Sequence, residues 1–558
     1  MKIYPHLIFI LFLFCSFNAT ASATTYYVDY SNGSDNNNGL SGGASGAWKT
    51  LDKVNRFNFN TGDDIYFKCG ETWNLNTEAI ENFTVDWNGT KDNYVIIGAY
   101  YMDGNTERIV DGLTHVCPGD KPTFDGDHSR PSNGPTANVG LINQRSSSAC
   151  WSYIQFQDLR AEESRAEGFE FSGDDSESCS NIRGYRLETY RSFNSGMAIW
   201  GDLDAVTIED CVLDQDVYYI FVSPGNGKAA AVQFKAQGTR GASTYPAASN
   251  ILWQNNVLKG HYGECYNIQH NDSLIIQDSL HFDNMKNDCI NLLGHYDSDG
   301  GSIIIRRNLF FQTEKARKWK EPQDGAVLTI QDSDDTYADK YPKGGDVFLG
   351  VEDVYFYNNL IAGYETGIEF ARGAWLDEQY KDPVQIHDKI YIYNNTFVDT
   401  EGYTFDCGTP AYVDYGDDIY IRNNIFAKYD INDSNCTGNA IPHACCTGPK
   451  TGNCDEMWQA PSCDNDPDFD NVVFNYNSYS RVPMSEDIKG PDDYYGDPLL
   501  LKNSGWMSLT GGSLNGSDFD LQSGSPVRYS NEVIGAQVHY NKSKVLSPPK
   551  KLTVKLKK

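Results

Sequence analysis

One strand-like phrase recurs along this sequence and limits the folds that the chain can adopt. Its copies begin at residues 206, 251, 274, 303, 354, 390 and 419. In each copy, apolar and polar residues alternate, one or two Asn or Asp residues follow, and apolar residues then resume, as in Ile390–Phe397 and Ile419–Phe426. Alternation with a period of two predicts a strand with one buried face, and its recurrence predicts a repeat architecture.

The Asn and Asp residues of the phrase predict a sharp corner between two short strands. These residues accept left-handed backbone angles and bond to nearby backbone. Coils stacked as parallel strands lie about 4.8 Å apart, so an Asn of one coil can bond to those of its neighbours. We therefore expect a structural ladder at Asp210, Asn256, Asp278, Asn308, Asn359, Asn395 and Asn424. The predicted fold is all-β, a right-handed parallel β-helix with an N-terminal capping helix and protruding loops.

A second strand accompanies most coils and predicts a polar outward face. Its apolar residues, such as Phe169, Phe234 and Ile330, should point inward, which turns the intervening side chains outward. An aromatic ring among amides and charged groups is typical of a sugar-binding surface, whereas a solvated sheet face would also be polar. The predicted substrate-binding residues are Trp200, Gln233, Asn267, Gln269, Asn291, His295, Gln331 and Arg372.

The ends of the chain predict four segments. Residues 1–23 have the charged start, short apolar run and Ala21-Ser22-Ala23 site of a secretory signal peptide. We expect a β-helix domain over 24–540, with Trp48–Val54 as its capping helix, and a basic tail over 541–558. No later segment is long and apolar enough to span a membrane. The expected location is therefore extracellular or periplasmic.

Cysteine usage agrees with export. The chain has 14 Cys, and disulfides form in oxidising compartments. Residues 431–465 contain five of them among Gly, Pro and Thr, which predicts a disulfide-stapled loop insertion rather than a zinc site, because paired C-x2-C spacing is missing. Cys265 and Cys289 hold matching places in adjacent coils and either form a disulfide or pack as small apolar groups.

The formal net charge of −31 argues against nucleic acid as a partner, because phosphate binding needs basic patches. It leaves an acidic polysaccharide open, since a groove can be locally basic or carboxylates can hold Ca²⁺ that bridges to uronate groups. We expect the protein to act as a monomer.

The N-terminal region resembles exported right-handed β-helix proteins of the pectate-lyase-like superfamily. Thr25–Asp35, Trp48–Leu51 and Gly62–Lys68 carry the resemblance, together with the Asn-Asn coils and Asp497–Leu499. It covers nearly the whole chain after residue 23. The resemblance implies the fold, but it identifies no single activity, because this superfamily includes lyases, hydrolases, epimerases and non-catalytic surface proteins.

A lyase acting on a uronate-containing polysaccharide by β-elimination is the leading functional prediction. Such a reaction needs a group that neutralises the uronate, a base and an acid. The resemblance implies Lys or Arg as the base and Ca²⁺ as a candidate cofactor. We predict Lys235, His270 and Asp288 as catalytic residues, with Lys235 as the base. The predicted Ca²⁺ ligands are Glu264, Asp288 and Asp324.

Two other functions remain open at this stage. A glycoside hydrolase would use paired carboxylates on the same face, at a separation set by its stereochemistry. A non-catalytic carbohydrate-binding or cell-surface β-helix would need the polar face alone.

Overall fold

The structure is a computed structural model of the chain. It describes residues 23–78, 82–127, 142–144, 151–164, 166–173, 179–217, 230–235, 248–269, 273–284, 289–293, 301–312, 326–331, 351–364, 366–371, 388–398, 411–413, 418–427, 443–444, 473–475, 478–479, 494–495, 528–529 and 532–533.

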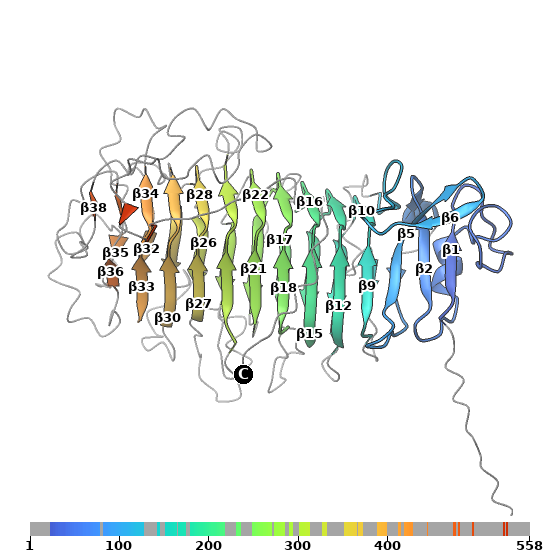
Figure 1. The fold of residues 1–558 in the computed structure, drawn as a ribbon, viewed down its shortest axis with the longest axis horizontal. Coiled ribbons are helices and arrows are strands. Elements are labelled where there is room, and N and C mark those ends of the chain that lie inside the picture. The colour runs from blue at the N-terminus through green and yellow to red at the C-terminus, as the bar shows by residue number, and fades with distance from the viewer. Residues whose placement is uncertain are drawn as a thin grey trace, which may run out of the picture.

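Three long parallel sheets make up the described chain, and Figure 1 shows their strands stacked along one axis. Sheet A consists, in order, of β1 (Thr25–Val28), β2 (Asp64–Lys68), β5 (Val95–Asp103), β9 (Ile154–Gln157), β12 (Cys179–Tyr185), β15 (Leu203–Glu209), β18 (Ile251–Gln254), β21 (Leu274–Gln277), β24 (Ile303–Arg306), β27 (Glu352–Tyr357), β30 (Asp388–Tyr393), β33 (Ile419–Arg422) and β36 (Val473–Asn475), with β6 (Thr106–Ile109) antiparallel to β5.

Sheet B consists of β3 (Thr72–Asn74), β7 (Thr123–Asp125), β10 (Arg160–Glu162), β13 (Glu188–Tyr190), β16 (Val212–Asp214), β19 (Val257–Lys259), β22 (Leu280–Phe282), β25 (Leu309–Phe311), β28 (Leu360–Ala362), β31 (Thr396–Val398), β34 (Ile425–Ala427), β37 (Ser478–Tyr479) and β38 (Tyr494–Tyr495).

Sheet C consists of β4 (Phe83–Thr84), β8 (Ile142–Gln144), β11 (Glu167–Ser172), β14 (Ser195–Trp200), β17 (Ala230–Lys235), β20 (Glu264–Gln269), β23 (Ile290–Leu293), β26 (Ala326–Gln331), β29 (Thr366–Ala371), β32 (Ala411–Val413) and β35 (His443–Ala444). A separate antiparallel pair joins β39 (Arg528–Tyr529) to β40 (Glu532–Val533).

Successive coils of the chain contribute one strand to each sheet. Strands β9, β10 and β11 form one coil, β12, β13 and β14 the next, and each pairs in parallel with its counterpart. Parallel strands joined by crossovers have a strong right-handed preference. The right-handed parallel β-helix predicted from the repeat is thereby confirmed, and with it the fold that the pectate-lyase-like resemblance implied.

A ladder of buried amides runs along the corner between sheets A and B. Asn308 donates from its side-chain Nδ2 and backbone N–H to Asn359 Oδ1, at 3.1 and 3.0 Å. Asn359 donates in the same way to Asn395, and Asn395 to Asn424. Each Nδ2 also reaches a backbone carbonyl, as in the 3.0 Å bond from Asn359 to Ile305. The predicted ladder is confirmed for these four residues.

Asp210 and Asp278 were predicted as members of this ladder, and the structure corrects that prediction. Both lie one position earlier, at the corner residue itself, where φ is 57° and 54°. The ladder positions belong to Cys211, whose N–H donates to Asn256 Oδ1 at 2.8 Å, and to Ser279. In each coil the left-handed conformation therefore belongs to the residue just before the ladder residue. Asn358, which precedes the ladder residue Asn359, is an example.

Helices are short in the described chain. Helix α1 (Leu51–Asn55) begins within the predicted helical segment and buries Leu51 and Val54, while the Thr50 side chain accepts from Lys53 N at its start. Helix α2 (Leu75–Glu78) follows β3. The role of α1 as a cap stays a prediction. No helix of the described residues has the length and apolarity needed to cross a membrane.

Two disulfides between described cysteines join neighbouring parts of the stack. Cys69 bonds to Cys117, and Cys265 bonds to Cys289 in the adjacent coil, which decides between the two alternatives left open for that pair. The predicted signal peptide, nearly all of the 431–465 insertion and the 541–558 tail fall outside the described residues. Those boundaries stay predictions.

The interior contains two histidines on adjacent coils. His261 and His281 are buried, and neither ring nitrogen of either residue has a hydrogen-bond partner among the described residues. Burial, with the nearby Lys259 charge, lowers the pKa of His261 to about 3. Burial, with a contribution from His261, lowers the pKa of His281 well below its ordinary value. Both rings are therefore neutral in the folded protein near neutral pH.

The first prediction concerns the amide ladder. Asn359→Ala should lower the free energy of unfolding by about 3–5 kcal/mol. The substitution leaves several buried polar groups of the ladder without a hydrogen-bond partner, and each such group costs about 1–3 kcal/mol. The matched control is Asn358→Gly. Glycine accepts the left-handed backbone of the corner, so this variant should lower the free energy of unfolding by only about a few tenths of a kcal/mol. Denaturant unfolding of both variants checks this. Equal losses in the two variants would show that the ladder contributes nothing beyond the corner.

The second prediction concerns acid stability. The unfolded chain takes up protons on these histidines below about pH 6.5, whereas the folded chain does not, so stability falls as the pH drops from there toward the lowered folded pKa. Between pH 7.5 and 5, the free energy of unfolding of His281→Phe should fall by about 2 kcal/mol less than that of the parent protein. The substitution suits the site, because the His281 ring stacks on Phe310 with centroids 4.4 Å apart. Parallel pH dependence of the two proteins would contradict this account.

Candidate functional site

The apolar side chains of sheet C point into the core, as predicted. Phe169, Val232, Ile268, Leu292 and Ile330 are buried at 0 to 1% exposure. Since side chains alternate along a strand, the intervening residues lie on the outward face. The register of the strands arranges these outward residues in rows that cross the coils.

Two rows cross the part of sheet C in which the predicted site lies. The middle row consists of Glu170, Ala198, Gln233, Asn267, Asn291, Thr329 and Glu369. The end row consists of Ser172, Trp200, Lys235, Gln269, Leu293 and Gln331. A third group lies where the strands begin, because Glu167 pairs with Ser195 and Ala230 pairs with Glu264.

Burial differs between the two rows. The middle row is closed off from solvent, with Glu170 and Thr329 at 0% exposure and Asn267 at 2%. In the end row, Trp200 and Lys235 are partly exposed. The predicted polar residues therefore do lie on the outward face of the sheet. The part of that face that solvent reaches lies toward the carboxyl ends of β14 and β17.

Glu264 is held by two amides from two coils. Asn267 Nδ2 donates to its Oε2 at 2.8 Å, and Asn291 Nδ2 donates to its Oε1 at 3.0 Å. Both carboxylate oxygens therefore have donors, although Glu264 is only 1% exposed. A buried carboxylate needs such compensation, because desolvation disfavours its charge. In a similar contact nearby, Gln233 Nε2 donates to Ser195 Oγ.

Lys235 and Glu167 have shifted pKa values on this face. Burial lowers the pKa of Lys235, while the charges of Glu264 and Glu167 act in the opposite direction. Burial raises the pKa of Glu167 to about 7, the nearby Glu170 charge adds to the shift, and Lys235 opposes it. One amine and three glutamates thus form an electrostatically coupled group with a titration near neutral pH, which is the property that acid–base catalysis needs.

Several buried polar atoms of this face have no hydrogen-bond partner among the described residues. They include Asn267 Oδ1, Asn291 Oδ1 and Thr329 Oγ1, which belong to three consecutive coils of the middle row. The Trp200 Nε1–H is likewise unpartnered. Unpaired buried polar atoms are costly. These atoms are closed off from solvent, so the accessible part of the face remains the end row with Trp200 and Lys235.

The structure brings together six of the predicted residues: Trp200, Gln233, Lys235, Glu264, Asn267 and Asn291. Gln269 pairs with Lys235 in the end row, and Gln331 lies in that row by its backbone. The predictions for His270, Asp288, His295, Asp324 and Arg372 fall outside the described residues and stay predictions.

Glu167 is the residue that the sequence reasoning missed. The alternation that predicts its strand begins at Phe169, two positions later, so the pattern does not include Glu167. The available signal was its place at the first position of β11, which corresponds to Glu264 in β20.

Of the three predicted Ca²⁺ ligands only Glu264 lies among the described residues, so the Ca²⁺ site stays a prediction. Ca²⁺ takes six to eight oxygen ligands, whereas the carboxylate of Glu264 already accepts an amide N–H on each oxygen. The group of described residues with metal-ligand spacing consists of Cys265, His281 and Cys289. Its sulfur and nitrogen donors do not suit Ca²⁺, and its two cysteines form a disulfide.

No protein-family model and no curated protein matches the sequence. Among solved structures, the chain is similar to a GH136 lacto-N-biosidase from Eubacterium ramulus, with 12% identity over 81% of this chain and 68% of that one, at a TM-score of 0.40. It is similar to a rhamnogalacturonan lyase, with 15% identity over 76% and 86% of the two chains and a TM-score of 0.37.

It is also similar to PfbA, a surface adhesin of Streptococcus pneumoniae, with 11% identity over 65% of this chain and 78% of that one, at a TM-score of 0.40. At these values the three similarities carry no argument about activity. Function has to be argued from the site itself.

Proposed function

We propose that the outward face of sheet C cleaves an acidic polysaccharide outside the cell by β-elimination, with Lys235 as the base. One observation carries this proposal. A partly exposed lysine whose pKa is lowered by burial stands on a buried polar face and is coupled to Glu167, whose pKa is raised to about 7. An elimination of this kind requires an amine that gives up its proton more readily than usual and a carboxyl group that keeps its proton more readily than usual.

The reaction assigns a proton to each of these residues. The neutral amine of Lys235 takes the proton from the carbon beside the uronate carboxylate. The electrons of that C–H bond form a carbon–carbon double bond, and the glycosidic bond to the leaving oxygen breaks. The protonated carboxyl of Glu167 gives its proton to that oxygen. The products are a chain with a new hydroxyl group and a chain that ends in an unsaturated uronate.

The end row is the part of this face that a polysaccharide can reach, because the middle row is closed off from solvent. Trp200 and Lys235 are its partly exposed members and lie side by side on adjacent strands. The Trp200 ring offers a surface on which a sugar can stack, and its Nε1–H has no partner among the described residues.

Ca²⁺ has no step in this proposal. The prediction that it neutralises the uronate depends on Asp288 and Asp324, which the structure does not describe. A chelator added to the activity assay tests that prediction separately: loss of activity that added Ca²⁺ restores would support it, and unchanged activity would contradict it.

Hydrolysis is the second candidate, and one observation favours it. Glu167 and Glu170 lie three residues apart on β11, and the charge of Glu170 contributes to the raised pKa of Glu167. A protonated and an ionised carboxyl on one face are the two groups of a glycoside hydrolase. Reducing ends formed without unsaturated uronate would identify this reaction, and binding without cleavage would identify the non-catalytic alternative.

The third prediction tests the base. Lys235→Ala should lower the rate of formation of unsaturated uronate from pectate, alginate or another uronan by about 100- to 10,000-fold, the usual contribution of a general base. Lys259→Ala is the matched control. Lys259 lies on sheet B and pairs with Asp214 at 2.8 Å, and loss of such a surface pair should change the rate by less than about twofold. Full activity of Lys235→Ala would exclude this residue as the base.

The fourth prediction concerns the pH profile of the same assay. The acid must be protonated, so the rate should fall as the pH rises through about 7, the raised pKa of Glu167. In Glu167→Gln the residual activity should lack this decline, because the amide does not titrate. A decline at the same pH in both proteins would assign it to another group.

A further inference from the structure

Two rows of outward-facing side chains cross sheet A from β18 to β33, strands that lie along one stretch of the stack in Figure 1. The inward residues of these strands, such as Trp253, Ile305 and Phe356, are buried at 0% exposure, so the residues between them point outward. The first row is Leu252, Ile275, Ile304, Tyr355, Tyr391 and Tyr420. The second row is Gln254, Gln277, Arg306, Tyr357, Tyr393 and Arg422. We call the two rows together the sheet A strip.

Solvent reaches the sheet A strip, in contrast to the closed middle row of sheet C. Every residue of the first row is partly exposed. In the second row Arg422 is exposed, and Gln277 is the one buried residue. The hydroxyl groups of Tyr391 and Tyr393 have no hydrogen bond to a described residue and are not among the buried polar atoms. The strip therefore offers accessible polar groups beside an apolar row.

The tyrosines of the strip present their ring edges. Tyr355 stacks on Tyr391 with centroids 5.0 Å apart, and Tyr391 stacks on Tyr420 at 5.2 Å. In the second row, Tyr357 stacks on Tyr393 at 4.7 Å. Each ring thus covers the face of its neighbour and turns its edge outward. The edge of an aromatic ring carries the positive part of its quadrupole, so a row of edges and hydroxyl groups suits a ligand rich in oxygen.

Arg306 is oriented by the neighbours in its own row. Its Nε donates to Gln277 Oε1 at 2.9 Å, and its Nη1 donates to the hydroxyl oxygen of Tyr357 at 2.8 Å. Gln277 donates in turn to Gln254 at 2.8 Å, and Gln254 to Glu209 at 2.9 Å. The Arg306 Nη2 is not buried and has no hydrogen bond to a described residue. A guanidinium that is already held in place loses little freedom when it binds a ligand.

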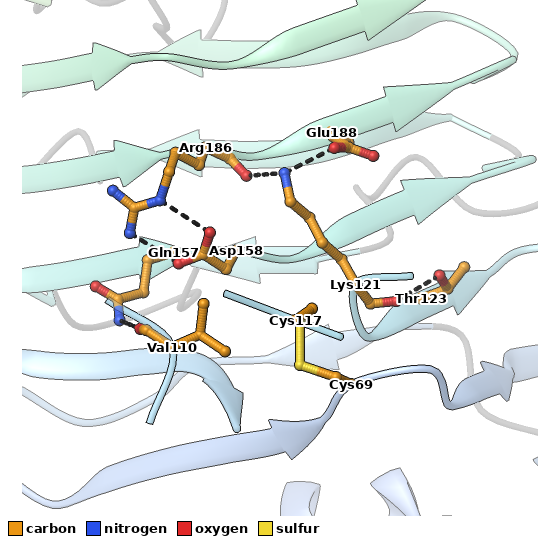
Figure 2. The surroundings of a disulfide bond; sticks show 9 residues. All are labelled: Cys69, Val110, Cys117, Lys121, Thr123, Gln157, Asp158, Arg186 and Glu188. Carbon is orange, nitrogen blue, oxygen red and sulfur yellow. Dashed lines mark hydrogen bonds and ion pairs between the residues drawn. A yellow bond between two sulfur atoms is a disulfide. The ribbon is translucent and has the colours of Figure 1, made fainter. Parts of the chain in front are cut away.

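The two arginines of the second row differ from other arginines of the stack in having no carboxylate partner. Arg186 is paired with Asp158, as Figure 2 shows, and Arg307 is paired with Asp278 at 2.6 Å. Neither arginine of the second row forms an ion pair within the described chain. In a chain with a net charge of −31, these unpaired cations on one strip indicate a complementary anion.

The carboxylates of the same three coils lie at the opposite edge of the strip, where β27, β30 and β33 begin. They are Glu352, Asp353, Asp388 and Asp418. Lys389 contacts Glu352 and Asp388. Negative charge thus borders the strip at the start of the strands, and positive charge lies at their ends. An anionic ligand would therefore turn its charged side toward the arginines.

We propose that the sheet A strip binds an extended acidic polysaccharide without cleaving it, at a surface separate from sheet C. Carboxylates of the glycan pair with Arg306 and Arg422, its C–H groups pack against the first row, and its hydroxyl groups bond to the tyrosine hydroxyls. The two arginines are three coils apart, which is about 14 Å at the usual spacing of parallel strands. That distance is comparable to the length of three sugar residues in an extended chain.

The experiment separates this surface from sheet C by the proteins that it compares. All of them carry Trp200→Ala and Lys235→Ala, which remove two partly exposed residues of sheet C and the proposed base. The strip variant adds Arg306→Gln and Arg422→Gln. The matched control adds Arg108→Gln and Arg183→Gln instead, which remove the same charge from β6 and β12, outside the strip. Thermal unfolding verifies that each protein is folded.

The fifth prediction concerns affinity electrophoresis of these proteins in native gels that contain polygalacturonate or alginate. We expect the starting protein to bind at least one of these uronans, and the control to bind it within about twofold. The strip variant should bind at least about tenfold more weakly, a loss of about 1.4 kcal/mol. Polygalacturonate whose carboxylates are methyl-esterified should also bind at least about tenfold more weakly than the free acid, because it carries no charge for the arginines.

Three results would overturn the proposal. They are absence of binding of both uronans by the starting protein, binding by the strip variant within twofold of the control, and equal binding of the esterified and the free polysaccharide. Every protein in the comparison lacks the proposed base, so none of these results depends on cleavage. Failure of this proposal and failure of the proposed lyase activity are therefore distinguishable.

Discussion

The amide ladder at the corner of sheets A and B is the constraint on which the rest of the structure depends. Asn308, Asn359 and Asn395 each bond to the next coil through both the backbone and the side chain, as Asn359 does to Asn395. A slip of one residue would break these buried bonds and would turn every side chain of a strand to the opposite face. Register is thus set at one corner and carried to sheet C. Asn291 can therefore meet Glu264 although 27 residues separate them.

The ladder also explains which parts of the fold could be predicted from the sequence. Consecutive Asn pairs, such as Asn358 and Asn359, identify the corner and the ladder position together. Where Cys211 or Ser279 takes the ladder position, the Asp that precedes it is the corner residue. Alignment on Asp278 then shifts that coil by one position. Distinguishing the two positions requires the backbone conformation, which residue identity alone does not reveal.

The candidate site was partly predictable for a related reason. Alternation within a strand indicates which side chains face outward, and Lys235, Asn267 and Asn291 follow from it. Alternation does not indicate burial or how strands begin. Glu264 lies at the start of its strand, and its role became clear only from the amides that hold it. Glu167 lies on β11, two strands from the β17 strand of Lys235 in sheet C, so its relation to Lys235 required the register of the coils between them.

A second ladder follows the outside of the same corner and explains why Asp210, unlike Asp158, has no arginine partner among the described residues. The left-handed corner residues of three successive coils are Asp158, Arg186 and Asp210. The Arg186 guanidinium donates both of its hydrogen bonds to Asp158 on the preceding coil. It acts on Asp210, on the following coil, only through its charge. Asp278 differs from Asp210, because Arg307 one coil later donates to its two carboxylate oxygens, from Nε at 2.8 Å and from Nη2 at 2.6 Å. Both arginines turn toward the preceding coil. A corner carboxylate is therefore paired where the next coil places an arginine at the corner, as after Asp278, and lacks that partner where the next coil places Asn255, as after Asp210.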